Sequence, residues 1–266
     1  MFTQYFGLKH NPFEKETPVE QLYESADLLE LDSRLKYLQS TRGLGMVVGE
    51  PGSGKSTALR RFVRTLNPSL YKPCYLALST VTVMDFYHGL ARALGETPAY
   101  RKVAMYRQIQ DAMSSSYYDQ KITPVVILDE MHLATNAVLE DLRLLLNFRM
   151  DSANPYILIL AGQPLIRDRL ALNTNAPLRQ RIAVRHMMRG LTPDETPDYL
   201  RSRLTLAGAT DPGLFDPQAA AQLHSISGGM LRPLNNLATA CLIQAAALRK
   251  QVVDADDVFL AQKEVA

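Results

Sequence analysis

The sequence predicts an α/β fold, in which a parallel β-sheet is flanked by helices and is followed by a small all-helical domain. Between residues 44 and 188, short apolar runs bounded by Gly or Pro alternate with longer amphipathic stretches. Such runs are typical of strands buried on both faces, and the stretches between them are typical of crossover helices. After Gly190 no strand-like run follows. We therefore expect an N-terminal arm and helix packing on the core (1–43), an α/β core (44–190) and a helical domain (191–266).

The individual elements follow from this alternation. Strands are predicted over 44–48, 74–79, 123–129, 155–162 and 181–188. Helices are predicted between them over 57–66, 83–94, 102–114, 133–148 and 165–170. In the C-terminal part, helices are expected from Pro193 toward Gly208 and over 216–226, 230–249 and 254–262, with Asp254 capping the last one.

Composition sets the protein class. The chain has 266 residues, is 47% apolar and carries a net charge of +2, which excludes a disordered or collagen-like protein. Cys74 and Cys241 form no metal motif. Neither a signal peptide nor a run of about 18 apolar residues is present in the sequence. We therefore expect a protein of the bacterial cytoplasm with no membrane partner.

The clearest motif is the glycine-rich segment GEPGSGKST, residues 49–57. It matches G-x-x-x-x-G-K-[ST], follows a predicted strand and opens a predicted helix, as a phosphate-binding loop requires. Glycines let the backbone approach phosphate oxygens, Lys55 can reach the β- and γ-phosphates, and the Ser56 hydroxyl can bind Mg²⁺. The alternative is a glycine-rich turn with a surface lysine. The residues expected to hold ATP are Gly49, Glu50, Pro51, Gly52, Ser53, Gly54, Lys55, Ser56 and Thr57.

A second motif is VVILDE, residues 125–130. Asp129 ends a buried strand, where a carboxylate is costly unless it meets a cation or strong donors. Mg²⁺ near Ser56 is the expected partner, and Glu130 can orient and deprotonate the attacking water. The alternative is an ordinary strand-end cap.

Several further strings resemble the AAA+ ATPases of the ExeA-like family, which is close to the transposition-helper ATPases of the TnsC, TniB and MuB type. The resemblance covers nearly the whole chain, and it implies oligomers, either a hexameric ring or a helical filament. The strings are YFGLKHNPF (5–13) followed by Leu22-Tyr23, DEMHLA (129–134), ILILAGQP (157–164), PLRQRIAVRH (177–186) and SGGMLRPLNNLATAC (227–241).

The resemblance implies roles for particular residues. Gln163 would be the sensor that faces the catalytic water. Arg181, or as second choice Arg179, would reach the γ-phosphate of a neighbouring subunit. Arg232 would touch the bound phosphate from the helical lid. His132 would sense the γ-phosphate or nucleic acid, or would serve as a helix-cap histidine. The N-terminal stretch would pack near the adenine, or would be an apolar arm docked on the core.

The charge is unevenly distributed. Residues 190–266 carry six Lys and Arg against nine acids, net −3, and the remainder carries 23 against 18, net +5. In transposition helpers a loop in the region of 97–102 binds duplex DNA, which implies DNA contacts here by Thr97, Tyr100, Arg101 and Lys102. The alternative is a basic helix start exposed to water.

Two functions are therefore expected. In the first, the ATPase assembles on double-stranded DNA and regulates transposition or target selection with a transposase or related recombination protein. In the second, it is the cytosolic ATPase module of an ExeA-type secretion or envelope assembly. The first is favoured, because secretion proteins of this type carry a transmembrane helix and a peptidoglycan-binding region beyond the ATPase, and neither follows Ala266.

Overall fold

A computed structural model describes residues 2–78 and 82–265, and the chain divides into two compact units. The α/β unit comprises Glu30–Gly49 and Ala58–Met188. The helical unit comprises the residues up to Leu29, Glu50–Thr57 and the residues from Arg189 on. The chain passes from the α/β unit to the helical unit between Met188 and Arg189, and both the N-terminal arm and the segment 50–57 group with the helical unit.

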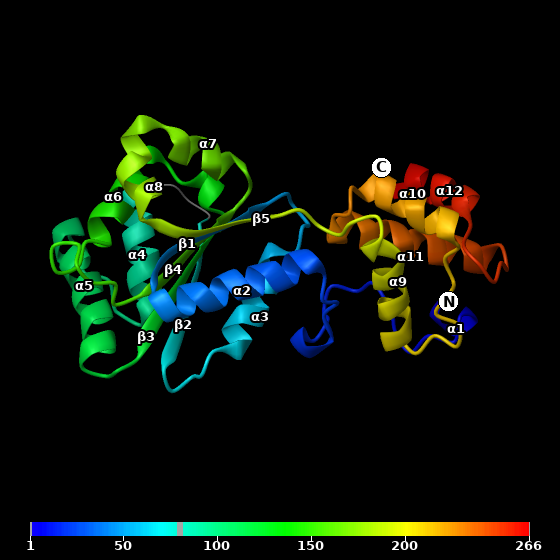
Figure 1. Cartoon of the computed structure of the whole chain (residues 1–266), viewed down its shortest axis with the longest axis horizontal. Coiled ribbons are helices and arrows are strands. Elements are labelled where there is room, and N and C mark those ends of the chain that lie inside the picture. Colours follow the sequence, from blue (N-terminus) through cyan, green and yellow to red (C-terminus); the bar gives the residue numbers. More distant parts are fainter. Residues whose placement is uncertain (1, 79–81, 266) are drawn as a thin grey trace. The chain divides into compact units, whose positions relative to one another are not determined.

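The α/β unit is built on a parallel sheet (Figure 1). In the described residues this sheet has five strands in the order β2-β3-β4-β1-β5, and every neighbouring pair is parallel. The fold class and the five predicted strands are confirmed, with ends that differ by up to three residues where they are described. The predicted end of the second strand at Ser79 lies outside the described residues. The strands are β1 (Gly43–Gly49), β2 (Tyr71–Ala77), β3 (Thr123–Asp129), β4 (Ile157–Gly162) and β5 (Ile182–Met188).

Burial on both faces was expected for all five strands, and this was wrong for two of them. Every residue of β1, β3 and β4 is buried. In β5 buried and exposed residues alternate, and in β2 only Cys74 is buried. The reason is the strand order, because β2 and β5 are the edge strands and have a neighbour on one side only.

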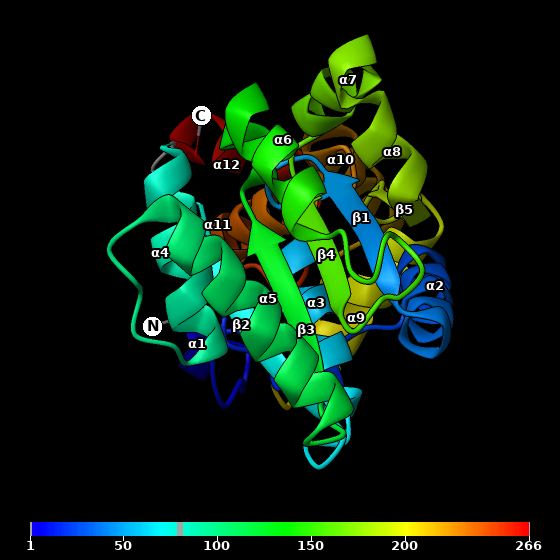
Figure 2. The same cartoon turned by 90° about the vertical axis from the view of Figure 1, so that its left-hand side faces the viewer.

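Helices cover both faces of the sheet (Figure 2). Leu44, Met46 and Val48 of β1 join the large apolar cluster with side chains of α4, α5 and α6. The intervening position, Gly45, faces α2, and a Cβ there would lie 2.5 Å from Leu38 Cδ2. Successive strand residues point to opposite faces, so this alternation separates the two helical layers. The helices of this part are α2 (Ala26–Thr41), α3 (Lys55–Thr65), α4 (Val83–Leu94), α5 (Lys102–Tyr118), α6 (Asn136–Leu145), α7 (Leu165–Ala171) and α8 (Ala176–Arg181).

Capping residues explain where predicted helix ends agree and where they do not. Helix α4 has the predicted bounds, because the Thr82 side chain accepts from Asp85 N at 3.1 Å and Gly95 ends the helix at φ 93°. Helix α6 begins later than the predicted residue 133, because Thr135 caps it and residues Met131–Leu133 form a separate 3₁₀ turn, η2. A second such turn, η3, covers Asn173–Asn175.

The helical unit contains the four predicted C-terminal helices, which are α9 (Glu195–Leu206), α10 (Pro217–Ser227), α11 (Leu231–Ala247) and α12 (Ala255–Val265) (Figure 1). Asp254 caps α12 as expected. Its Oδ1 accepts from Asp257 N and Asp257 Oδ2 accepts from Asp254 N, both at 3.1 Å. This reciprocal pair satisfies two backbone donors at the helix start.

The N-terminal arm, which includes α1 (Phe2–Tyr5) and the 3₁₀ turn η1 (Val19–Gln21), belongs to the same unit. Phe6, Leu8 and Phe13 join the apolar cluster formed by the C-terminal helices. Arg203 of α9 is 6% exposed and donates to Pro12 O at 2.7 Å and Glu14 O at 3.2 Å. The arm was expected to pack on the ATPase core, and these contacts place it on the helical unit instead.

Candidate functional site

The glycine-rich segment forms a tight loop between β1 and α3. Gly52 and Gly54 have φ of 84° and 97°, a backbone region that side chains disfavour. Ser53 N donates to Glu50 O at 3.1 Å, and Lys55 Nζ donates to the same carbonyl at 3.0 Å. Ser53 is 1% exposed, and its Oγ finds no hydrogen-bond partner among the described residues. A buried, unpaired hydroxyl and a lysine folded over the loop fit a site for phosphate oxygens.

Arg232 lies against this loop within the same unit. Arg232 N, at the start of α11, donates to Gly52 O at 3.1 Å. A Cβ at Gly52 would lie 2.8 Å from Arg232 Cβ, so only glycine allows this approach. The structure therefore brings two predicted site elements together, namely the loop and the arginine of the lid helix.

Three other predicted residues, Asp129, Glu130 and Gln163, lie at the carboxyl edge of the sheet. The strands β3, β4 and β1 are neighbours and parallel, so Asp129, Gly162 and Gly49 end at one edge. Asp129 is 5% exposed, and both of its carboxylate oxygens accept hydrogen bonds. Oδ1 accepts from Glu130 N at 2.8 Å, and Oδ2 accepts from the Tyr75 hydroxyl at 2.9 Å. Two donors thus stabilise this buried carboxylate, which would be costly without such partners.

Tyr75 was not identified from the sequence. Burial, the hydrogen bond to Asp129 and the charges of Asp129 and Glu130 raise the pKa of Tyr75 to about 12, so its hydroxyl is protonated at neutral pH. The signal that could have found it is the two-residue period of strands, which puts residues 75 and 77 on one face of the second strand.

Glu130, His132 and Gln163 form a small cluster beside Asp129. Glu130 adopts a left-handed conformation with φ 57°, and its Oε2 lies 3.3 Å from His132 Nδ1. The same Nδ1 lies 3.4 Å from Gln163 N. An unprotonated Nδ1 accepts from Gln163 N, whereas a protonated Nδ1 donates to Glu130. Gly162 permits this packing, because a Cβ there would lie 3.1 Å from His132 N.

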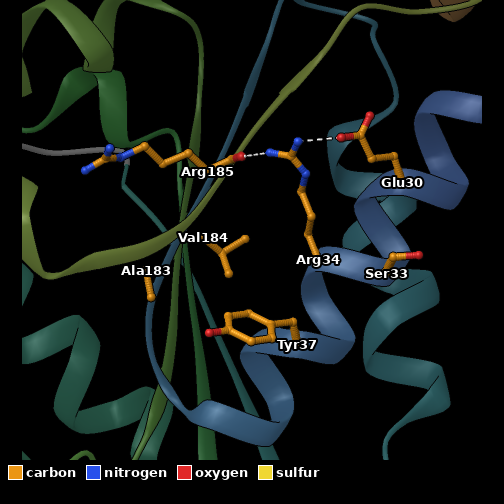
Figure 3. Close-up of a pocket in the computed structure, with 7 residues that line it drawn as sticks. All are labelled: Glu30, Ser33, Arg34, Tyr37, Ala183, Val184 and Arg185. Atoms are coloured by element: carbon orange, nitrogen blue, oxygen red, sulfur yellow. Dashed lines mark hydrogen bonds and ion pairs between the residues drawn. The ribbon is translucent and has the colours of Figure 1, made fainter.

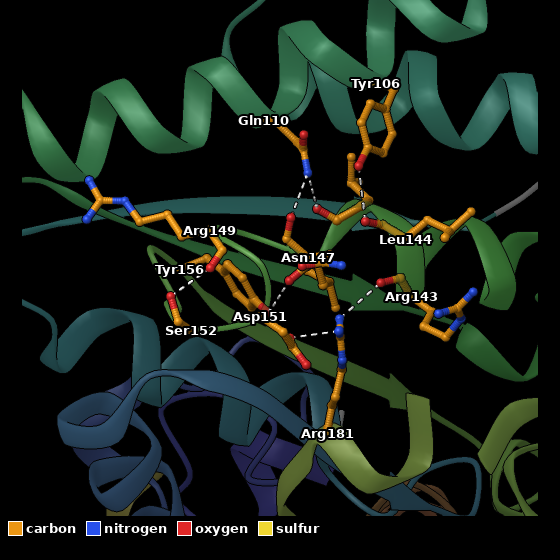
Figure 4. Close-up of polar contacts among 12 residues, drawn as sticks. Tyr106, Gln110, Arg143, Leu144, Asn147, Arg149, Asp151, Ser152, Tyr156 and Arg181 are labelled. Carbon is orange, nitrogen blue, oxygen red and sulfur yellow. Dashed lines mark hydrogen bonds and ion pairs between the residues drawn. The ribbon is translucent and has the colours of Figure 1, made fainter. Parts of the chain in front are cut away.

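Arg181 caps the end of α6 (Figure 4). Its Nη1 donates to Arg143 O at 3.0 Å, and its Nη2 lies 2.7 Å from Asp151 Oδ1. The neighbouring carbonyls at this helix end also accept from side chains. Tyr106 donates to Leu144 O, Gln110 to Leu145 O and Asn147 O, and Tyr156 to Leu146 O. The trans-arginine candidate therefore has a structural role inside its own chain.

Arg179, the second candidate, has a similar role at α7. Its Nη1 donates to Leu170 O at 3.2 Å and to Ala171 O at 2.8 Å. Cations at the carboxyl end of a helix satisfy orphan carbonyls and complement the helix dipole. A role in trans remains a prediction for both arginines, and it would require either guanidinium to exchange these contacts.

One side chain, that of Gln108, bonds to two backbone groups of the predicted DNA loop. Gln108 Nε2 donates to Thr97 O at 2.8 Å, and Gln108 Oε1 accepts from Ala99 N at 3.1 Å. Beyond this clamp Tyr100 is 93% exposed, and Arg101 is also exposed.

Lys102 is not a free cation of this loop. Its Nζ lies 2.7 Å from Oδ1 and 2.8 Å from Oδ2 of Asp141, a carboxylate on α6 whose side chain is 10% exposed. The pair joins the start of α5 to α6. Thr97, Tyr100 and Arg101 are exposed, and DNA contact by the four residues stays a prediction, which for Lys102 would compete with the pair to Asp141.

A shallow groove lies between α2 and the edge strand β5 (Figure 3). Arg34 donates to Glu30 and to the Arg185 carbonyl there. The groove contains none of the predicted site residues. Its lining residues are Glu30, Ser33, Arg34, Tyr37, Ala183, Val184 and Arg185.

Comparison with known proteins assigns the family. The family model described as "AAA domain" matches residues 38–170, which contain the loop, Asp129 and Glu130, and Gln163. The chain belongs to this AAA family. These proteins are P-loop ATPases, so the chain is a nucleotide-binding AAA ATPase by family.

One sequence relative and several structures are similar to this AAA chain. The general secretion pathway protein A of Aeromonas hydrophila is 32% identical over 270 residues, which is 100% of this chain and 48% of that protein. The chain thus spans about half the length of that relative. Pyrobaculum aerophilum Cdc6p superposes with a TM-score of 0.67 at 18% identity, over 99% of this chain and 71% of that one. Thermotoga maritima RuvB superposes with a TM-score of 0.60 at 17% identity, over 96% and 73%.

Two further observations concern the part of the chain that the structure describes. No helix within the described ranges 2–78 and 82–265 is long and apolar enough to cross a membrane. In the same ranges no cluster of three or more His, Cys, Asp or Glu side chains could by itself hold a metal ion. Mg²⁺ in nucleotide sites is usually held by one or two protein groups together with phosphates and water, so a single buried carboxylate is the donor set that such a site needs.

Proposed function

We propose that this AAA protein binds ATP with Mg²⁺ and hydrolyses it to ADP and phosphate. The observation that carries the proposal is the loop 49–57, with its two left-handed glycines, the buried unpaired Ser53 hydroxyl and Lys55 Nζ at 3.0 Å from a loop carbonyl. Lys55 would turn from Glu50 O to the β- and γ-phosphates. Ser56 and Asp129 would hold Mg²⁺, which would neutralise charge on the phosphates during transfer.

Glu130 is the proposed general base. Its carboxylate is half exposed at the carboxyl edge of the sheet, where water can reach it. His132 lies 3.3 Å away and holds the glutamate in place, and Gln163 approaches the same histidine from β4. In this proposal Gln163 orients the water and Arg232 reports the bound phosphate to the helical unit. A positioned base contributes about 10²- to 10⁴-fold to such a step.

We further propose that the protein oligomerises on duplex DNA in an ATP-dependent manner, as a ring or helical filament, and regulates transposition with a transposase in the bacterial cytoplasm. The support is the net charge of +5 outside residues 190–266 and the exposed Tyr100 and Arg101 on an ordered loop. Among the similar structures, Aeropyrum pernix ORC1, with a TM-score of 0.64 at 18% identity over 90% of this chain and 64% of that one, was solved in complex with DNA.

The second candidate is the ATPase module of an ExeA-type secretion assembly. The specific observation in its favour is the 32% identity to general secretion pathway protein A across the whole of this chain. This candidate has the same ATP site but a different partner. It therefore predicts that the exposed residues of the loop do not bind DNA.

Binding to duplex DNA separates the two candidates. With a non-hydrolysable ATP analogue, the first predicts salt-sensitive, ATP-dependent assemblies in filter binding and electron microscopy, because phosphate contacts release counterions. Arg101→Ala should weaken binding about equally on unrelated sequences. Arg201→Ala is the matched control, because it removes one exposed arginine from the helical unit. If wild type fails to bind duplex DNA at low salt, the DNA function is wrong and the secretion candidate takes its place.

A further inference from the structure

The hydroxyl of Tyr75 connects the edge strand of the sheet to the carboxylate proposed to hold the metal. Tyr75 lies on β2, which has only β3 as a neighbour, and its side chain is largely solvent-exposed. Even so, its hydroxyl donates to Asp129 Oδ2 at 2.9 Å, and Asp129 is buried. The hydroxyl of an exposed tyrosine can bond to water instead. Its hydrogen bond to a buried carboxylate is therefore a contact that solvation alone does not require.

Strand register explains how the contact forms. Tyr75 lies opposite Ile127, and Ala77 lies opposite Asp129. Side chains two residues apart share a face, so Tyr75, Ala77, Ile127 and Asp129 all point to one side of the sheet. Because the directly opposite residue is only an alanine, the space beside Asp129 is open to the diagonal neighbour. Diagonal positions across a strand pair are within reach of an aromatic side chain.

The two donors fix the plane of the Asp129 carboxylate. Glu130 N bonds Oδ1 at 2.8 Å, and this bond comes from the backbone next to it. With that bond alone the second oxygen would have no donor, and the carboxylate could rotate about the Cβ–Cγ bond. The Tyr75 hydroxyl removes this freedom while leaving the remaining lone pairs of both oxygens available. Outer-shell donors of this kind orient metal-binding carboxylates.

We propose that Tyr75 is a positioning residue for Mg²⁺ binding, which orients Asp129 toward the metal through the hydrogen bond to Oδ2. The inference rests on the proposed function, since it gives Asp129 the metal. Tyr75 itself touches neither the nucleotide nor the metal in this assignment. Its loss should therefore weaken the response to Mg²⁺ and leave metal-free nucleotide binding unchanged.

The test measures binding of a fluorescent ATP analogue to the full chain, at increasing Mg²⁺ and separately in EDTA. Tyr75→Phe should raise the half-saturating Mg²⁺ concentration about 10-fold, the lower end of the loss typical for outer-shell partners. Affinity in EDTA should stay as in wild type. Tyr71→Phe is the matched control, since it removes a hydroxyl from the same face of β2 four residues earlier, and its Mg²⁺ response should equal that of wild type. In an Asp129→Asn background, Tyr75→Phe should have no further effect.

The outcomes are distinct. If wild type responds to Mg²⁺ and Tyr75→Phe responds as Tyr71→Phe does, the inference is wrong while the proposed function stands. If Tyr75→Phe weakens binding equally with Mg²⁺ and in EDTA, the hydroxyl only supports the fold, and the inference is again overturned. If nucleotide binding by wild type is independent of Mg²⁺, the proposed function fails and the inference fails with it.

Discussion

Replacing Arg181 by alanine separates a structural role from a role in trans. In the structure Arg181 donates to Arg143 O at 3.0 Å and pairs with Asp151 at 2.7 Å. A hydrogen bond from a charged donor contributes about 1.5–3 kcal/mol. The ion pair adds at most about 1 kcal/mol, because the Asp151 side chain is 57% exposed and water screens the charge. Arg181→Ala should therefore destabilise the α/β unit by roughly 2–3 kcal/mol, and Asp151→Asn by less than about 1 kcal/mol.

Urea unfolding followed by far-UV circular dichroism measures both changes, since the chain contains no tryptophan to report on folding. The midpoint should fall clearly for Arg181→Ala and only slightly for Asp151→Asn. Equal midpoints for wild type and Arg181→Ala would refute the capping role.

The role in trans has its own readout. The Arg181→Ala variant still has an intact phosphate loop, and the Lys55→Ala variant still has Arg181, so each could supply what the other lacks. A mixture of the two should hydrolyse ATP faster than either alone if Arg181 acts on a neighbouring subunit. If activity in the mixture is no more than the sum of the two separate preparations, Arg181 is only a helix cap.

Three further predictions follow from single contacts. Gly52→Ala should weaken nucleotide binding, as measured by calorimetry. The added Cβ would lie 2.8 Å from Arg232 Cβ, and the left-handed backbone at this position would add a strain of about 1–2 kcal/mol. An affinity equal to that of wild type would contradict this. Arg203→Ala should destabilise the helical unit by several kcal/mol and make the arm sensitive to protease, because the buried guanidinium holds two arm carbonyls; an unchanged digestion pattern would oppose it. Burial would raise the pKa of Glu195, but hydrogen bonds from Thr192 N and Ala26 N outweigh it and leave that pKa below the ordinary 4.5. This stabilisation is therefore present above pH 4.5 and is lost as pH falls through the lowered value. Glu195→Gln should remove that part of the acid dependence of the urea midpoint, and an acid dependence equal to that of wild type would refute the assignment.

Local sequence signals predicted most of the fold. The five strands were predicted because each contains a short apolar run, and the predicted bounds of α4 agree with the caps that Thr82 and Gly95 form in the structure. The exposure of β2 was not predictable, because the strand order is a long-range property. The same holds for the arm, whose position depends on Arg203, some 190 residues away in the chain.

The candidate site was predictable to the extent that it is a local motif. The loop 49–57 and the pair Asp129–Glu130 were identified from residue type and spacing alone. The tasks of Arg181 and Lys102 were not, because each side chain is engaged by a partner on a distant segment, the end of α6 for Arg181 and Asp141 for Lys102. A cationic side chain in a sequence motif can equally bind a ligand or cap a helix, and only the tertiary contacts distinguish the two.

The measurement that tests the central claim most directly is ATP turnover by Glu130→Gln compared with wild type. If Glu130 is the general base beside a functional phosphate loop, the variant should bind ATP with Mg²⁺ as wild type does and release phosphate at least about 10²-fold more slowly. Phosphate release at the wild-type rate would contradict the assignment of Glu130. No phosphate release by wild type itself, with and without duplex DNA, would contradict the proposed ATPase activity.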